Sequence, residues 1–292
     1  MRLVGQNERP LVCKKLCSTL TTYFIRSPVL WQRPILHLAL SLRAGDVVPD
    51  SAIDPRSDLD EILNGLDTSA LIALLWFSGT LADEISRMES NSSAHAQLHN
   101  QMESIVRDAG AVMSRAFNQP YAASDATLKA EALKSFLTWV NYAQPMWPRK
   151  PEALQHLRDL ITDATQCLVD PSLQRDALDA FRDILESYTS FFQPQHMELL
   201  SRIIAAHVQP ILLRTLADKD PEGLPYGQMI IAFGDANIQQ VVEQPDNEYG
   251  SRMVVKLHFD ILKAPGHPGD EDELSIQSIE FWNTYVYNQA VV

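Results

Sequence analysis

Two histidines and a glutamate fall on one face of a predicted helix and could bind a metal ion. His95, His99 and Glu103 are each four residues apart, a spacing that aligns side chains along an α-helix. Zinc-binding helices with two histidines at this spacing carry a glutamate directly after the first histidine, and a third ligand elsewhere. Ala96 occupies that position here. The pattern therefore favours a solvated polar helix face over a metal site.

Three cysteines could supply thiol groups, but their spacing fits no disulfide framework. They are Cys13, Cys17 and Cys167. Cys13 and Cys17 lie on or beside the apolar stripe of the first predicted helix, and we interpret them as small buried apolar residues. Cys167 lies near a predicted helix end with no identified base, which argues against a nucleophile. A small odd number of cysteines indicates a reducing compartment.

The densest charge run in the chain is acidic. Acidic residues at a helix N-terminus interact favourably with the helix dipole, which is the simpler interpretation of the run. The alternative is a contact site for a basic surface on a partner protein. The candidate partner-binding residues are Asp270, Glu271, Asp272 and Glu273.

The rest of the chain shows no pattern for catalysis. The phosphate-binding glycine loops of P-loop and dinucleotide-binding proteins do not occur. The acids of Asp58-Leu59-Asp60-Glu61 are typical of a helix N-terminus, and the tryptophans fit core packing better than a ligand cage. We therefore expect a protein that is not an enzyme and that uses no cofactor and no metal ion.

Helices must position these residues, because apolar residues recur at the helical period through most of the chain. Thr68, Asp170 and Asp220 are expected to cap helices, and Pro34 to kink one. No segment alternates apolar and polar residues over enough positions to predict a β-strand. The predicted helices lie at about 10–25, 28–42, 59–63, 68–88, 92–117, from 125 to the turn at Pro145, 151–168, 171–188, 194–216, 221–244, 250–263 and 272–289.

A repeated motif indicates how the helices are organised. Ala132-Leu133-Lys134-Ser135-Phe136 and Ala177-Leu178-Asp179-Ala180-Phe181 are 45 positions apart. Helix pairs repeating every 40–47 residues or so are typical of HEAT-type α-solenoids. We predict an all-α solenoid of HEAT-like antiparallel helix pairs that forms one domain over 1–292. About six repeats are expected, near 10–43, 68–117, 125–168, 172–216, 221–263 and, incomplete, 271–290.

Composition limits the partners. The chain of 292 residues is 46% hydrophobic and 21% charged, as expected for a globular protein. Its net charge of −13 argues against direct binding of nucleic acid, which needs a basic surface, and favours basic protein partners. The sequence contains no run of about 18 apolar residues, so we predict no membrane span.

Three stretches resemble a known family. They are Lys14-Lys15-Leu16-Cys17 followed by Trp31 in the next helix, Lys134-Ser135-Phe136-Leu137-Thr138-Trp139-Val140, and Ser278-Ile279-Glu280-Phe281-Trp282 within Leu274 to Trp282. Their order and spacing over most of the chain are similar to the importin-β (karyopherin-β) superfamily. The resemblance favours its importin-13-like and transportin-SR-like branch and a fungal member.

The resemblance implies a nuclear transport receptor that acts without catalysis in cytoplasm and nucleus. Its partners would be protein cargo of basic character, with the GTPase Ran and nucleoporins binding the full-length protein. Because family members are much longer, the resemblance also implies that this chain is a fragment. The alternative from another functional class is a HEAT-repeat scaffold or regulatory subunit of a cytosolic complex.

Overall fold

The computed structural model describes residues 10–54, 56–88, 93–119, 125–264 and 273–291, without side chains at 93–97, 125, 248, 249 and 291. Helices and turns make up these described segments, and they contain no β-strand. The chain divides into two compact units, Met1–Asp163 and Ala164–Val292. Short α9 (Ile161–Thr165) spans the boundary in sequence.

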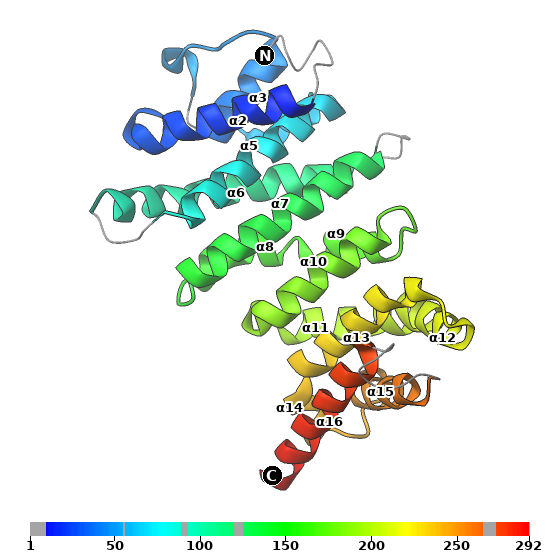
Figure 1. Ribbon diagram of the computed structural model, residues 1–292. Coiled ribbons are helices and arrows are strands. Elements are labelled where there is room, and N and C mark those ends of the chain that lie inside the picture. The colour runs from blue at the N-terminus through cyan, green and yellow to red at the C-terminus, as the bar shows by residue number, and fades with distance from the viewer. Residues whose placement is uncertain (1–9, 55, 89–92, 120–124, 265–272, 292) are drawn as a thin grey trace. The chain divides into compact units, whose positions relative to one another are not determined.

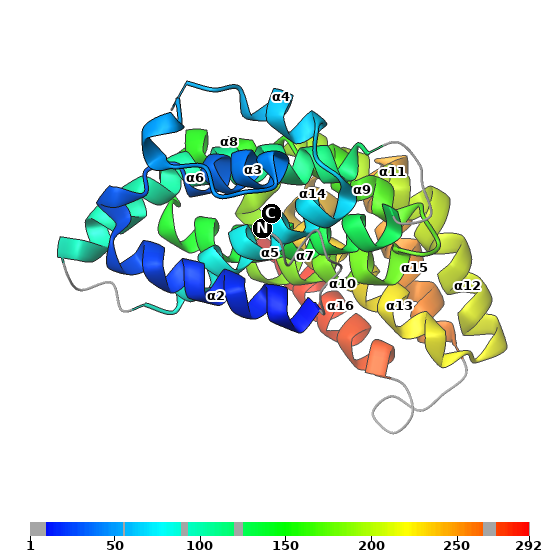
Figure 2. The same ribbon diagram turned by 90° about the horizontal axis from the view of Figure 1, so that it is seen from above.

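The first unit has two rows of helices (Figures 1 and 2). In its first row, α5 (Thr68–Ser86) packs between α2 (Pro10–Arg26) and α7 (Asp125–Met146). In the second row, α6 (Ser93–Phe117) contacts α3 (Pro34–Ala44), α4 (Leu59–Asn64) and α8 (Pro151–Arg158). Each first-row helix is followed in sequence by a helix of the second row. These alternating pairs bury apolar faces that no single pair could cover.

The second unit repeats this arrangement. Its first row is α10 (Gln174–Ser187), α13 (Leu224–Ala236) and α16 (Glu273–Val291), with α13 packed against both neighbours. The second row holds α11 (Pro194–Ile203), α12 (Gln209–Asp218), α14 (Ile238–Glu243) and α15 (Met253–Lys263). Short 3₁₀ turns lie at Pro28–Leu30, Asp50–Ala52, Gln166–Leu168, Thr189–Phe191 and Pro221–Gly223, and π-helical turns at Ile204–Val208 and Glu248–Arg252.

Aromatic side chains fill the core of each unit. Trp139, Tyr142 and Phe136 of α7 are almost completely buried in the first unit, and Phe181 and Phe281 are buried in the second. Burying a large apolar side chain stabilises a protein by roughly 1.5–3 kcal/mol. Phe136 and Phe181 end the two copies of the repeated motif, so the motif marks the buried face of a first-row helix.

Two helix starts differ from the prediction. Pro34 does not kink a helix; it is the first residue of α3, where its missing N–H costs no hydrogen bond, and a separate 3₁₀ turn precedes it. The cap of α5 is Asp67 rather than Thr68, because the Asp67 carboxylate accepts a hydrogen bond from the Ala70 N–H at 2.8 Å. The predicted start at Asp58 is confirmed, since Asp58 accepts from the Asp60 N–H.

Asp170 and Asp220, each followed by a proline, lie in short turns before the long helices: Asp220 caps the 3₁₀ turn Pro221–Gly223, whereas Asp170 caps no helix. Asp170 accepts a hydrogen bond from the Ser172 N–H, and Asp220 from the Glu222 N–H, both at 2.9 Å. Because each aspartate closes this short turn, α10 starts only at Gln174 and α13 at Leu224.

Several long predicted helices are interrupted. The segment predicted as 194–216 contains the π turn Ile204–Val208, and 151–168 breaks after Arg158. The segment 221–244 breaks at Asn237, whose backbone leaves helical geometry at φ −109° and ψ 10°. The helix-pair architecture of an α-solenoid is confirmed, while the division into one domain of about six repeats stays a prediction.

Candidate partner-binding surface

Helix α10 has an acidic face opposite its buried one. Ala177, Phe181 and Ile184 point into the core. Asp176, Asp179, Asp183 and Glu186 follow each other at intervals of three or four residues on the outward side. This spacing aligns the four carboxylates along the helix. The face would repel itself without a compensating cation.

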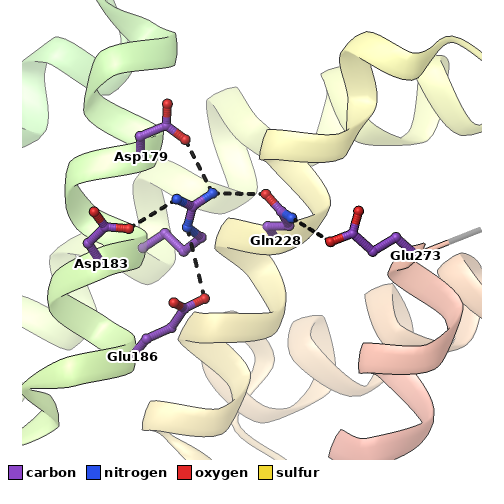
Figure 3. Close-up of polar contacts among 6 residues, drawn as sticks. Asp179, Asp183, Glu186, Gln228 and Glu273 are labelled. Carbon is purple, nitrogen blue, oxygen red and sulfur yellow. Dashed lines mark hydrogen bonds and ion pairs between the residues drawn. The ribbon is translucent and has the colours of Figure 1, made fainter.

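Arg182 is that cation, because its guanidinium forms ion pairs with Asp179, Asp183 and Glu186, which are labelled in Figure 3. Its guanidinium is 3.0 Å from Asp183, 3.3 Å from Asp179 and 3.9 Å from Glu186. Partial burial alone would lower the pKa of Arg182, but the hydrogen bond to Asp183 and the surrounding carboxylates raise it above its usual value. The arginine therefore stays charged and neutralises only part of the face.

The same guanidinium starts a chain of hydrogen bonds across the first row (Figure 3). Arg182 donates to the side-chain oxygen of Gln228 on α13 at 2.9 Å. Gln228 in turn donates to the carboxylate of Glu273 on α16 at 3.3 Å. We call Arg182, Gln228 and Glu273 the polar ladder. It joins three helices that follow one another in the row.

Two further carboxylates, Asp235 and Glu280, have no cation to balance them among the described residues. Burial, together with smaller contributions from the charges of Glu280 and Glu186, raises the pKa of Asp235 at the end of α13 to about 6. Among the described residues, Asp235 and Glu280 form no ion pair. Three carboxylates from α10, α13 and α16 thus share one region with excess negative charge. We call the α10 carboxylates, Glu273, Asp235 and Glu280 together the acidic surface.

The predicted acidic run overlaps this surface at one residue. Glu273 begins α16 and accepts the ladder hydrogen bond from Gln228. Asp270, Glu271 and Asp272 lie outside the described residues. The α10 carboxylates were missed because they are spread along a helix rather than adjacent in sequence. Their helical spacing is the signal that could have found them.

The histidine helix does not gather its candidate ligands into a metal site. His99 Nδ1 lies 2.6 Å from the Tyr142 hydroxyl, and the two rings stack. Glu103 forms an ion pair with Lys150, and the side chain of His95 lies outside the described part. In the described residues no group of three or more His, Cys, Asp or Glu could hold a metal ion. His99 and Glu103 instead connect α6 to α7 and to the turn before α8.

The cysteines are buried, as expected for small apolar residues. Cys13 and Cys17 face the core from α2, and Cys167 is also buried. Burial, with a smaller contribution from Cys13, raises the pKa of the Cys17 thiol to about 12. A thiol with such a pKa stays protonated near neutral pH and is a poor nucleophile.

Fold and surface together define a class: an all-α helical-repeat protein with an acidic exposed face. None of the helices in the described segments is both long enough and apolar enough to cross a membrane. No protein-family model matches the chain. Stacked helix pairs of this kind form extended surfaces that repeat proteins commonly use for binding.

The chain has a distant similarity to a known protein. The chain is 21% identical over 160 residues to the importin beta-like protein kap111 of Schizosaccharomyces pombe, strain 972 / ATCC 24843. The match covers 53% of this chain but 16% of that protein. This similarity supports, at most, a distant relationship between this chain and the importin-β superfamily.

Proposed function

We propose that this chain is part of a nuclear transport receptor of the importin-β kind, and that its acidic surface binds basic protein cargo. The observation that carries the proposal is the group formed by Asp235, Glu280 and Glu186, in which no ion pair with another described residue neutralises Asp235 or Glu280. A lysine or arginine from a partner would replace this repulsion by attraction. The net charge of −13 adds long-range attraction for basic proteins.

The finer parts of the proposal are those that the family resemblance of the sequence implies. We infer that Ran and nucleoporins bind the receptor, that it moves between cytoplasm and nucleus, and that it belongs to the importin-13-like and transportin-SR-like branch in a fungus. The helical-pair fold supports a role in holding proteins rather than in catalysis.

A binding assay tests this function. The chain, and any longer protein that contains it, is immobilised and offered Ran loaded with GTP, Ran loaded with GDP, and lysine-rich proteins. The proposal expects Ran-GTP to bind the longer protein more tightly than Ran-GDP, and basic proteins to bind the acidic surface. Binding of neither Ran-GTP nor basic proteins contradicts it. A diffuse cytosolic distribution without enrichment at the nuclear rim would favour a scaffold instead.

A further inference from the structure

His37 on α3 has a hydrogen-bond partner at each of its two ring nitrogens. Its Nε2 lies 2.7 Å from the carbonyl oxygen of Val48. Because a carbonyl oxygen only accepts, Nε2 must carry the hydrogen. Its Nδ1 lies 2.9 Å from the indole Nε1 of Trp31, which only donates, so Nδ1 must be without a hydrogen. The two partners therefore require the same neutral tautomer of His37.

A carboxylate lies beside the ring nitrogen that carries no hydrogen. Oδ1 of Asp50, in the 3₁₀ turn Asp50–Ala52, is 3.2 Å from Nδ1 of His37. The carboxylate cannot bond to the neutral ring there, because Nδ1 has nothing to donate. In the protonated ring both nitrogens donate. Protonated His37 would therefore keep Val48 and gain Asp50, but its Nδ1–H would point at the N–H of Trp31.

Solvent can deliver this proton. The side chain of His37 is 14% exposed and that of Asp50 is 75% exposed, and both line a pocket of about 200 Å³. Among the described lining residues the other charged group is Arg33, whose guanidinium donates to both carboxylate oxygens of Asp108 on α6. The negative charge of Asp108 is thus paired, and Asp50 is the carboxylate that faces Nδ1.

Trp31 connects this histidine to the packing of the first unit. The ring centroids of Tyr23 and Phe24 on α2 and of Phe77 on α5 lie 5.7 to 6.4 Å from that of Trp31. Tyr23 is the titratable group among these three. Because Trp31 is 8% exposed, its N–H would lose an acceptor that little solvent can replace. A proton on His37 therefore acts where α2, α3 and α5 meet.

We propose that His37 is a pH-sensitive switch that exchanges one hydrogen bond for another. In the neutral form Nδ1 accepts from Trp31. After one proton is taken from solvent, Nδ1–H donates to Asp50 and the indole N–H of Trp31 turns away. Nε2–H donates to the Val48 carbonyl in both forms, so the loop stays attached to α3. The switch goes beyond the proposed binding function, because it lies in the first unit and needs no partner.

Nuclear magnetic resonance of the ¹⁵N-labelled chain between pH 8 and pH 5, the range in which histidines commonly change charge, tests the switch. The ring nitrogens of His37 report its protonation, and the indole N–H signal of Trp31 reports the bond to Nδ1. We expect both signals to change with one midpoint, and the neutral ring to carry its hydrogen on Nε2. A constant indole signal while His37 is protonated, a neutral ring with its hydrogen on Nδ1, or a ring that stays neutral at pH 5 would overturn the proposal.

Two variants should move the midpoint of this titration in opposite directions. Asp50→Asn removes the charge that favours the protonated ring, and should lower the midpoint by about half a pH unit. Trp31→Phe removes the donor that favours the neutral ring, and should raise the midpoint by about the same amount.

Asp46→Asn is the matched control for Asp50→Asn. Asp46 is exposed in the same loop and accepts a hydrogen bond from the Val47 N–H, which asparagine can also accept. It should leave the midpoint nearly unchanged. Equal shifts in Asp46→Asn and Asp50→Asn, or a higher midpoint in Asp50→Asn, would overturn the proposal. This comparison decides the matter even if Trp31→Phe fails to fold, because Asp50 is an exposed residue.

Discussion

Arg182 donates a hydrogen bond to Gln228, which lies 46 positions later on the next helix of the same row. Gln228 then donates to Glu273, a further 45 positions along. The spacing of the polar ladder therefore agrees to within one residue with the 45-position spacing of the sequence motif ending at Phe136 and Phe181. Equivalent positions of successive helix pairs meet side by side, as expected when similar units stack.

Arg182 should be the residue of the ladder with the greatest effect on stability. Arg182→Met keeps the apolar stem but leaves the carboxylates of α10 without their cation and Gln228 without its donor. We expect a loss of about 1–2 kcal/mol in the free energy of unfolding, measured with urea. Arg87→Met removes an exposed ion pair with Asp83 and should cost no more than about 0.5 kcal/mol. Equal losses in the two variants would show that the ladder does not stabilise the unit.

Asp235→Asn should stabilise the protein in a pH-dependent way. The pKa of Asp235 is raised to about 6 in the folded state, whereas an unfolded aspartate has a pKa of about 3.9. The folded state therefore holds the proton more tightly, and ionisation of Asp235 lowers stability as pH rises from about 4 to 6.

The gain from Asp235→Asn should be absent below about pH 4 and complete above about pH 6. Because Asp235 keeps contact with solvent, we expect about 0.5 kcal/mol rather than the full value of the shift. Urea unfolding at low and neutral pH measures it. In a Glu280→Gln background the gain should shrink, since one of the repelling charges is gone. A gain that is the same at every pH contradicts this account.

Gly234 marks a close approach of three helices. A Cβ added there would lie 2.8 Å from Nε2 of His258 and 3.0 Å from Val254, with Phe281 at 3.2 Å. Gly234→Ala should destabilise the protein by about 1–3 kcal/mol through overpacking. Gly79→Ala, where the nearest atom would be 3.7 Å away in Ser135, should instead stabilise α5 by up to about 1 kcal/mol. Thermal unfolding of both variants gives the test; a shift of the same sign in both would be inconsistent with the packing described.

The cysteines should resist thiol reagents while the protein is folded. Cys13, Cys17 and Cys167 are buried, and the pKa of Cys17 is raised to about 12. We expect Ellman's reagent to react with all three only after denaturation, at rates that follow unfolding. Rapid labelling of Cys17 in the native protein would show that α2 does not pack against α5 as described.

The helices were predictable where the pattern is local. The first helix, the short one after Asp58 and the one ending at Phe117 were all placed to within a residue or two, because apolar spacing and caps mark them. The interruptions were not predicted. Pro210 lies two residues after the π turn Ile204–Val208, and its missing N–H and its ring disfavour a regular helix there, whereas the break at Asn237 has no proline beside it. The prediction of a kink at Pro34 was wrong because a proline can either interrupt a helix or occupy its first turn, and Pro34 does the latter.

The acidic surface was predictable only in part. Glu273 was named because it belongs to a run of acids, whereas Asp235, Glu280 and the α10 carboxylates are distant in sequence. They meet only after α10, α13 and α16 stack. The polar ladder could not be predicted for another reason. Its three equivalent positions hold three different amino acids, arginine, glutamine and glutamate, so a search for a repeated sequence motif does not find them.

The central claim is that the acidic surface recognises basic protein segments, and affinity for a synthetic Lys/Arg-rich peptide at low salt tests it most directly. The triple variant Glu186→Gln, Asp235→Asn and Glu280→Gln should bind about tenfold more weakly than the unmodified protein. The control triple Glu84→Gln, Glu152→Gln and Asp218→Asn makes the same change of net charge on other exposed carboxylates, and should stay within about twofold. Equal weakening in both triples would contradict the claim, because binding would then follow net charge and not this surface.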